Sequence, residues 1–554
     1  MGVKLLVIGG VAAGATAAAR ARRISESAEI TLLERGPHVS YANCGLPYFL
    51  SGDIDKRSKL LLQTPEGFHT RYRVKVLVGT EAFEIDRAAK RVRARGPEGE
   101  TTFPYDKLIL AQGGAPVAPG VPGAGSPQVF RLWTVSDMDR IHDYIARSRP
   151  RTALVVGGGF VGLEMAEAFR KRGLETTVVE VLPSVMAAMD PPFGGRIERE
   201  LEANGVRVRT GKGVVRFRPE DGVAELSDGS QVPAELVLFS VGVRPELALA
   251  RDAGLEVGPS GGLVVNDRLE TSDPDIYAAG DMVEVHHKVS GRRARLPLAG
   301  PANRQGRIAA SNALGLDLRY GGALGTSVVK VFEATAAITG LSERSAREAG
   351  FRVGVAEIHK EHHAGYFPGA KELALKLVYD RGTSRVLGAQ AFGHAGVEKR
   401  IDAVAMALQR EMTLQDLSEV DLSYAPPYSS ANDPLNIAAF VGANDVSGFS
   451  PLATAAELKE ALSSDDVPLV LDVRTRSEFE RSHLRGACHI PVDALRVEAE
   501  KLPRDRRIFV HCRSGFRAHL ALRILVERGF RRVLNVTGGY LAIQAEGGFE
   551  TEGA

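Results

Sequence analysis

Cysteine is scarce in this chain of 554 residues, which contains only Cys44, Cys488 and Cys512. Three thiols cannot build a disulfide framework, so a disulfide-stapled secreted fold is excluded, and we expect reduced thiols and a cytoplasmic location. Charge of one sign is also lacking, because 70 Lys and Arg residues face 68 Asp and Glu residues. Without a polybasic field we expect no nucleic-acid or membrane partner, and a small molecule is the expected ligand.

Long apolar runs are missing as well. None approaches the roughly 18 consecutive apolar residues that a membrane-spanning helix needs. The segment 3–19 is apolar, but Gly9, Gly10 and Gly14 interrupt it and Arg20 follows directly, which is not typical of a secretory signal. The length instead predicts about three or four globular domains.

A glycine turn near the N-terminus predicts a dinucleotide-binding unit. The apolar run 4–8 leads into the turn 9–14, which holds three glycines and is followed by an alanine-rich stretch that favours a helix. The next apolar run ends in Glu34, 25 residues after Gly9, close to the spacing of about 20 for the acid that binds a ribose. Glycines let a pyrophosphate approach the helix N-terminus. Val11 departs from the GxGxxG pattern at its third position.

A second copy of this unit follows the full pattern. The run 153–156 leads into Gly157, Gly159 and Gly162, and Glu180 stands 23 residues after Gly157. A carboxylate there accepts a hydrogen bond from a ribose 2′-hydroxyl and repels a 2′-phosphate. Because the neighbouring Val181 offers no cation, we expect NADH to be preferred over NADPH, unless an arginine from elsewhere in the fold reaches the phosphate.

Two further apolar runs, 108–114 and 275–281, end in small residues that permit close approach of a ring system. Four motifs in this order resemble the flavoprotein disulfide reductases with two dinucleotide sites, over roughly residues 1–445. The resemblance implies FAD in the first unit, NAD(P)H in the second, and Asp281 on the flavin ribityl chain. The cofactor-binding residues that it implies are Gly9, Gly10, Ala13, Gly14, Glu34, Arg35, Asn43, Ala111, Gly113, Gly157, Gly159, Phe160, Val161, Gly162, Glu164, Glu180, Gly242, Gly280, Asp281 and Ala299.

Cys44 has no local thiol partner in the segment 40–48. A lone thiol must store its oxidised state as a sulfenic acid or as a mixed disulfide with a small thiol. This setting is similar to the single-cysteine branch of the family. Its NADH oxidases and peroxidases carry a histidine in the first glycine turn, where this chain has Ala12, whereas its coenzyme A disulfide reductases lack that histidine. We therefore expect a mixed disulfide with CoA, and sulfenic-acid chemistry or a non-catalytic redox sensor remain the alternatives.

Residues for binding CoA are also indicated. Arg20 and Arg23 lie three apart on one face of the first predicted helix, where they would hold CoA phosphates or form a solvated basic surface. Tyr366 and Tyr424 match tyrosines of the CoA disulfide reductases. The resemblance implies that these phenols reach across a homodimer interface and assist a departing thiolate; two satisfied core tyrosines are the alternative. The other residues expected in the CoA pocket are Thr16, Ser40, Asn43, Arg71 and Asn303.

The last hundred residues predict a separate α/β domain. Three short apolar strand candidates, 469–473, 508–511 and 533–536, alternate with helical patterns, which is typical of a parallel sheet. The second strand ends at Cys512, directly before a loop and a helical stretch. We expect a thiol at a helix N-terminus, surrounded by backbone N–H groups and by Arg513 and Arg517, conditions that stabilise a thiolate and a persulfide anion.

The Cys512 loop resembles the active-site loop of the rhodaneses. The segments 471–474, 482–487 and 537–539 match other rhodanese signatures in the same order. This resemblance implies that Cys512 carries sulfane sulfur and that Arg517 assists it. Cys488, on an apolar run, is expected to be structural.

The predicted fold class is α/β, with two Rossmann-type domains, an α+β dimerisation domain and a C-terminal rhodanese domain joined by a polar linker at 441–448. The adjacent histidines at 286–287 and 362–363 are expected at the surface, and no metal site is expected, since no cysteine or carboxylate set completes one. The predicted boundaries are 1–112 and 245–322 for FAD, 113–244 for NAD(P)H, 323–445 for dimerisation and 446–554 for the rhodanese domain.

Taken together, these motifs predict a homodimeric enzyme that uses FAD and NAD(P)H to reduce CoA disulfide, CoA persulfide or polysulfide through Cys44. The rhodanese domain is expected to handle the sulfane sulfur at Cys512.

Overall fold

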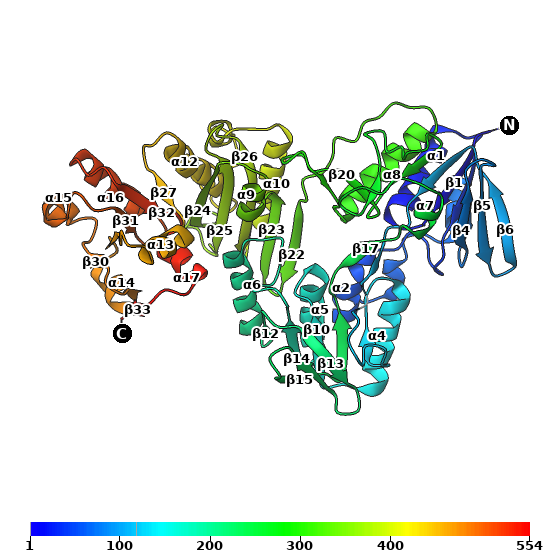
Figure 1. Cartoon of the computed structure of the whole chain (residues 1–554), viewed down its shortest axis with the longest axis horizontal. Coiled ribbons are helices and arrows are strands. Elements are labelled where there is room, and N and C mark those ends of the chain that lie inside the picture. The colour runs from blue at the N-terminus through cyan, green and yellow to red at the C-terminus, as the bar shows by residue number, and fades with distance from the viewer. Residues whose placement is uncertain (1, 118, 554) are drawn as a thin grey trace. The chain divides into compact units, whose positions relative to one another are not determined.

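The computed structural model describes residues 2–117 and 119–553. By their contacts the described residues group into two compact units (Figure 1). The first is Met1–Pro183 with Leu201–Gly325, and the second is Ser184–Glu200 with Thr326–Ala554. No helix in the described ranges is long and apolar enough to cross a bilayer.

A five-stranded parallel sheet opens the first unit, in the order β19-β7-β1-β2-β3. The predicted strands are confirmed, and a late segment, β19, completes a sheet that the N-terminus begins. The strands are β1 Lys4–Ile8, β2 Glu29–Leu33, β3 Lys75–Leu77, β7 Lys107–Leu110 and β19 Ile276–Ala278. The helices of this part are α1 Ala12–Ile24, α2 Leu46–Ser51, α3 Pro65–Tyr72, α7 Ala248–Asp252 and α8 Ala299–Ala313.

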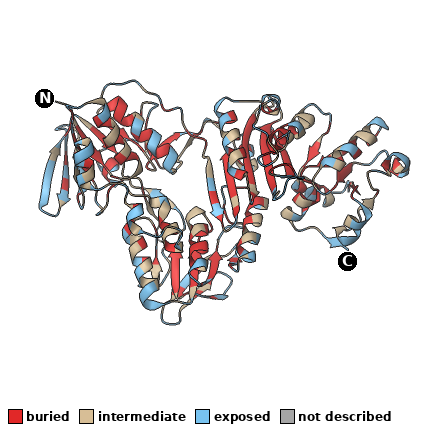
Figure 2. Cartoon of the chain, turned by 180° about the vertical axis from the view of Figure 1, so that it is seen from behind, coloured by how far each residue is buried: buried red, intermediate tan, exposed pale blue. Residues whose placement is uncertain are grey.

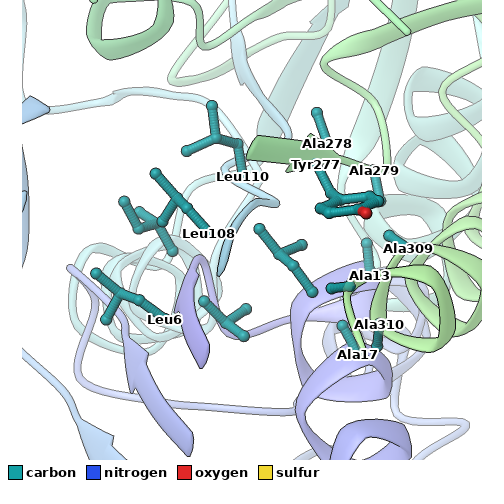
Figure 3. Close-up of a cluster of buried hydrophobic side chains, with 14 of the residues drawn as sticks. Leu6, Ala13, Ala17, Leu108, Leu110, Tyr277, Ala278, Ala279, Ala309 and Ala310 are labelled. Atoms are coloured by element: carbon teal, nitrogen blue, oxygen red, sulfur yellow. The ribbon is translucent and has the colours of Figure 1, made fainter. Parts of the chain in front are cut away.

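Small residues allow α1 and α8 to pack closely against each other and against this sheet. Ala13 and Ala17 of α1 lie beside Ala309 and Ala310 of α8 in one buried apolar cluster (Figure 3). A Cβ at Gly306 would come within 2.2 Å of the Ala13 carbonyl oxygen, so only glycine fits there. The close approach brings the start of α8 beside the first glycine turn.

A second parallel sheet repeats the motif in the order β12-β11-β10-β16-β9. Its strands are β9 Val129–Phe130, β10 Thr152–Val156, β11 Glu175–Val179, β12 Arg207–Arg209 and β16 Leu236–Phe239, and its helices are α4 Val135–Ser148 and α5 Phe160–Lys171. Most of α6 Pro191–Ala203 belongs to the second unit. Two antiparallel sheets accompany the Rossmann sheets. They are formed by β4 Glu81–Asp86, β5 Arg91–Gly96 and β6 Gly99–Pro104, and by β13 Val214–Arg218, β14 Val223–Leu226 and β15 Gln231–Pro233.

The second unit contains an antiparallel sheet in the order β22-β23-β26-β25-β24, so β24 is an edge strand. Most residues of its central strands are buried (Figure 2). Its strands are β22 Ser327–Val331, β23 Ala334–Gly340, β24 Val353–Glu361, β25 Glu372–Asp380 and β26 Val386–Gly393. Its helices are α9 Glu343–Glu348, α10 Val397–Gln409, α11 Leu414–Ser418 and α12 Pro434–Val446.

The C-terminal part is an α/β layer with a parallel sheet in the order β27-β32-β31-β28-β30. This confirms the predicted strands. They are β27 Leu452–Ala453, β28 Leu469–Asp472, β30 Cys488–His489, β31 Ile508–His511 and β32 Val533–Val536, with helices α13 Ala455–Leu462, α14 Arg476–Arg481, α15 Leu495–Glu498, α16 Phe516–Glu527 and α17 Gly539–Glu546.

The predicted linker at 441–448 is wrong, because most of it is the end of α12. Asp433 caps this helix by accepting the Leu435 N–H, and Pro434 occupies its first turn. Gly442 lets the helix approach Leu414, whose Cδ2 would lie 2.9 Å from an added Cβ. Tertiary packing therefore makes a helix of a stretch whose small polar residues predict a linker.

The predicted surface position of the histidine pairs is also wrong in part. His287 and His363 are buried, whereas their neighbours His286 and His362 are more accessible. The rings of His362 and His363 are in contact, with centroids 4.2 Å apart.

Candidate functional site

The first glycine turn forms a backbone cradle at the N-terminus of α1. Gly9 has φ of +99°, and a Cβ at Gly14 would come within 1.8 Å of the Gly9 carbonyl oxygen, so side chains are excluded at both positions. The Gly10 N–H donates to Glu34 Oε2 over 2.8 Å, and the Gly36 N–H donates to Oε1 over 2.7 Å. These bonds fix the acidic side chain at the end of β2, beside the turn.

A cavity borders this turn, and two partly buried polar residues in its lining are suited to a hydroxyl-bearing ligand. Burial raises the pKa of Asp281 to about 6. The Gln112 Oε1 atom is buried with no hydrogen-bond partner among the described residues. Both groups would accept hydrogen bonds from a ribityl or ribose hydroxyl, so these residues fit FAD. The predicted residues in the lining are Gly9, Gly10, Ala13, Glu34, Arg35, Asn43, Ala111, Gly113, Gly280 and Asp281.

Eight residues of this lining are not among the predicted cofactor-binding residues. They are Val11, Ala12, Tyr41, Gln112, Gly114, Trp133, Thr134 and Ala302. Gln112 stands between two predicted residues, so its position beside the small-residue run was a usable signal. Among the predicted residues, Gly14 and Ala299 lie outside the lining. Gly14 packs against the Gly9 carbonyl of the turn, and Ala299 is the first residue of α8.

The second glycine turn repeats the geometry of the first. Gly157 has φ of +107°, and a Cβ at Gly162 would come within 2.0 Å of the Gly157 carbonyl oxygen. The Gly158 N–H donates to Glu180 Oε2 over 2.7 Å, as Gly10 does to its own acid. Gly159 caps α5, which begins with the predicted Phe160 and Val161, and Gly242 lies before β17 Val243–Pro245 with φ of +99°. Two dinucleotide cradles are therefore present in one unit.

Cys44 lies in a 3-10 turn, Asn43–Gly45, directly before α2. The Asn43 side-chain oxygen accepts the Cys44 N–H over 3.1 Å and lies 3.7 Å from the sulfur. Cys44 is exposed, but partial desolvation of its sulfur, and then the negative charges of Glu164 and Asp281, raise the pKa of the thiol. The side chains of the unit therefore favour the protonated thiol, and a thiolate needs help from a bound group.

Glu164 is the ionisable side chain with the largest Coulombic effect on Cys44. It lies on α5 and accepts a hydrogen bond from the Tyr48 phenol over 3.1 Å. Burial raises the pKa of Glu164 to about 7, although the bond from Tyr48 opposes the shift. A carboxyl with this pKa can hold or release a proton beside the thiol at neutral pH.

The predicted CoA residues on α1 and α8 come together. The Thr16 hydroxyl donates to Asn303 Oδ1 over 2.6 Å, and the Arg20 Nε donates to Ser311 Oγ over 3.1 Å. Burial and the charges of Arg307 and Arg23 lower the pKa of Arg20, which marks a cluster of cations able to attract phosphate. Sequence reasoning missed Arg307, although it stands four residues after Asn303 on the same helix face.

The other predicted CoA residues are placed differently from one another. Ser40 has φ of +48°, and its N–H donates to the Gly10 carbonyl over 2.8 Å, beside the first turn. Asn43 lies in the cavity lining and precedes Cys44. Arg71 is exposed on α3, and none of the contacts recorded for the described residues joins it to the arginines of α1.

Tyr366 and Tyr424 lie side by side in the second unit although 58 positions separate them. Their hydroxyl oxygens are 3.2 Å apart, and both side chains are exposed. The hydrogen bond between them raises the pKa of Tyr366. An exposed pair of linked phenols excludes the reading of two buried core tyrosines.

Cys512 is buried at the end of β31, and its sulfur accepts the Gly515 N–H over 3.1 Å. Arg517, on the first turn of α16, has its pKa raised by Glu478 and by Cys512, and it binds both oxygens of Glu478 at 2.6 and 2.8 Å. The Arg513 guanidinium, expected around the thiol, instead pairs with Glu372 over 2.8 Å. The loop is thus a helix N-terminus with a sulfur at its centre, and one of the two expected arginines points to a partner outside it.

Three family models match successive parts of the chain. The model described as pyridine nucleotide-disulphide oxidoreductase matches residues 3–306. Its dimerisation domain matches residues 326–434, and the rhodanese-like domain matches residues 454–546.

Relatives extend this likeness over most of the chain. A protein of Pyrococcus abyssi named NAD(P)H sulfur oxidoreductase (CoA-dependent) is 35% identical over 79% of this chain and 97% of its own length. A coenzyme A disulfide reductase of Staphylococcus haemolyticus is 32% identical over 78% of this chain and 98% of its own.

Solved structures cover nearly the whole chain. The reduced Bacillus anthracis protein CoADR-RHD is 38% identical, with a TM-score of 0.96 over 98% of both chains. An NAD-dependent persulfide reductase from A. fulgidus is 36% identical, with a TM-score of 0.90 over 97% of this chain and 99% of its own.

Proposed function

Because the chain belongs to the pyridine nucleotide-disulphide oxidoreductases, we propose that it reduces the sulfur–sulfur bond of CoA disulfide or CoA persulfide with NAD(P)H. The observation that carries this proposal is Cys44, the only cysteine before residue 488, in a turn beside the dinucleotide cavity. A thiol without a neighbour needs a second sulfur from a soluble ligand to form a disulfide. Two relatives are named a CoA-dependent NAD(P)H sulfur oxidoreductase and a coenzyme A disulfide reductase, and these names indicate the chemical class of that ligand.

FAD bound in the first cradle would take a hydride from NAD(P)H and supply two electrons to the sulfur at Cys44. The chain's own residues then bind and orient the substrate. Cys44 attacks one sulfur of CoA disulfide, forms a Cys44–CoA disulfide and releases one CoA thiolate. Reduction of that bond releases the second CoA and restores Cys44, so one disulfide, one NADH and one proton give two CoA thiols and NAD⁺.

The proton that a departing thiolate needs has two sources in this proposal. Glu164, with a pKa of about 7, holds a proton beside Cys44 in the same unit. Tyr366 and Tyr424 supply a phenol from the partner subunit of a homodimer, since a dimerisation-domain model matches residues 326–434. Thr16, Asn303 and the arginines of α1 hold the CoA.

The C-terminal domain adds sulfur transfer in this proposal. Cys512 takes up sulfane sulfur as a persulfide, which the backbone N–H of Gly515 and the Arg517 guanidinium stabilise. Exchange with CoA would couple this domain to Cys44. We place the enzyme in the cytoplasm, where thiols such as these stay reduced.

Single serine substitutions test the two sulfur sites separately. The Cys44→Ser variant loses NADH-dependent reduction of CoA disulfide, whereas Cys512→Ser retains it and loses transfer of sulfur from thiosulfate to cyanide. Cys488→Ser is the matched control and keeps both activities. Undiminished CoA disulfide reduction by the Cys44 variant would overturn the proposal, and oxygen or peroxide as the only oxidants consumed would favour sulfenic-acid chemistry instead.

A further inference from the structure

The hairpin formed by β24 and β25 touches the Cys512 loop from outside the rhodanese-like domain. The Thr537 hydroxyl accepts the Glu357 N–H over 2.8 Å and donates to the Glu357 carbonyl over 3.1 Å, on the free edge of β24. The residues after Thr537 support the loop, because the Tyr540 N–H donates to the Cys512 carbonyl over 2.8 Å. One turn thus binds the edge strand on one side and the reactive loop on the other.

A second contact joins the same hairpin to the loop directly. Glu372, the first residue of β25, pairs with Arg513, the residue after Cys512, at 2.8 Å. Glu372 belongs to the sheet of the dimerisation part, 140 residues before Cys512. The reductase half therefore supplies a charged side chain to the sulfurtransferase loop.

Each of the two arginines of this loop is neutralised by a carboxylate. Glu478 binds Arg517 through both oxygens, and Glu372 binds Arg513. The backbone N–H groups, the helix N-terminus and Arg517, which interacts with Cys512 as well as with Glu478, stabilise a single negative charge on a persulfide. A donor with a second negative charge gains little from cations that already have partners.

We infer that Glu372 is a specificity-determining, positioning residue of the sulfurtransferase site. By holding Arg513, it disfavours dianionic sulfur donors such as thiosulfate relative to donors with one negative charge or none, the class to which alkyl thiosulfonates and small-molecule persulfides belong. The inference rests on the proposed function of Cys512. The inference adds to that function a residue from outside the rhodanese-like domain and a preference for sulfur donors with at most one negative charge.

The transfer step is the same for both donor classes. The Cys512 thiolate attacks the outer sulfur of the donor, a new sulfur–sulfur bond forms, and the donor's own sulfur–sulfur bond breaks. The leaving group takes the electron pair, as sulfite from thiosulfate or as a sulfinate from a thiosulfonate. Cyanide then takes the outer sulfur as thiocyanate and restores the thiolate, so charge and electrons balance.

The test measures thiocyanate formation by the full-length chain with thiosulfate and with methanethiosulfonate as donors. In Glu372→Gln, we expect kcat/KM for thiosulfate to rise about three- to tenfold, with less than a twofold change for methanethiosulfonate. The gain should shrink in about 0.5 M salt, because exposed charges are screened. Glu372→Asp retains the negative charge and should keep the wild-type ratio of kcat/KM between the two donors. In the double variant Glu372→Gln/Arg513→Gln, the rise in kcat/KM for thiosulfate should be absent.

The matched control is Glu361→Gln. Glu361 lies directly across from Glu372 in the β24–β25 register, and no ion pair is recorded for it among the described residues. This substitution removes the same charge from the same hairpin, and it should change the ratio of kcat/KM for the two donors by less than twofold. If Glu372→Gln changed kcat/KM equally for both donors, or if Glu361→Gln changed the donor ratio as much as Glu372→Gln does, the inference about Glu372 would be overturned. The proposed function of Cys512 would be unaffected. Wild-type chain that forms no thiocyanate from either donor would overturn the sulfurtransferase proposal and this inference with it.

Discussion

The Tyr48 phenol donates a hydrogen bond to Glu164 over 3.1 Å, and this carboxyl is the foremost charged neighbour of Cys44. The pKa of Glu164 is raised to about 7 by burial, so its negative charge develops as the pH rises through neutrality. That charge in turn raises the pKa of the Cys44 thiol. The ionisation of the Cys44 sulfur is therefore coupled to a partly buried carboxyl on α5, the helix that follows the second glycine turn.

The first prediction concerns this coupling. Glu164→Gln removes the charge, so the Cys44 thiolate forms at lower pH, and alkylation of Cys44 by iodoacetamide at pH 8 should be about two- to fivefold faster. The difference should vanish below pH 6, where Glu164 is protonated in the wild-type chain as well. Alkylation profiles that coincide across the whole pH range would contradict the coupling.

The tyrosine pair carries the second prediction. Tyr366→Phe or Tyr424→Phe removes a hydroxyl from the linked pair and should lower kcat for CoA disulfide about tenfold or more. The kcat of the double variant should be about equal to that of the less active single variant, because the effects of two residues that act as one unit are not additive. Tyr428→Phe, at another exposed tyrosine, is the control and should leave kcat unchanged. Multiplicative losses would show that the two phenols act independently.

A third prediction addresses the nucleotide preference. Val181 is 67% exposed directly after Glu180, so an arginine there would meet a 2′-phosphate. Val181→Arg should raise the NADPH to NADH ratio of kcat/KM about tenfold. Val215→Arg, on an exposed strand position, adds the same charge and should not change the ratio. A wild-type chain that already prefers NADPH would contradict the role given to Glu180.

Stability supplies the fourth prediction. Thr537→Val removes a buried hydroxyl that is bonded to both backbone groups of Glu357, and the loss should cost about 1–3 kcal/mol in the free energy of unfolding. Thr537→Ser keeps the hydroxyl and should recover most of it. Denaturant titration followed through the C-terminal domain measures the difference. Equal midpoints for valine and serine would show that the hydroxyl does not hold the turn to β24.

Much of the fold was predictable because it follows local patterns. The two glycine turns, their acids at the ends of β2 and β11, and the strand before Cys512 are each set by neighbours within about 25 residues. The helix α12 was missed since Gly442 and Asn444 resemble a linker, whereas its packing against Leu414 decides the conformation. The local signals Asp433 and Pro434 mark where that helix begins, but no local pattern carries it through Gly442 and Asn444.

The partners of side chains were less predictable than their positions. Arg513 was expected at the thiol, but its partner Glu372 comes from a sheet 141 residues earlier in the chain. The third cation beside the predicted CoA residues, Arg307, likewise depends on the packing of α8 against α1. Long-range contacts of this kind leave no periodic trace in the sequence.

The central claim is that Cys44 takes its second sulfur from CoA, and the mass of the Cys44 peptide tests it most directly. After incubation with CoA disulfide and without NADH, we predict a peptide heavier by about three-quarters of a kilodalton, an increase that NADH or a thiol reductant removes. An unmodified peptide, or one that gains only oxygen atoms, would contradict the account.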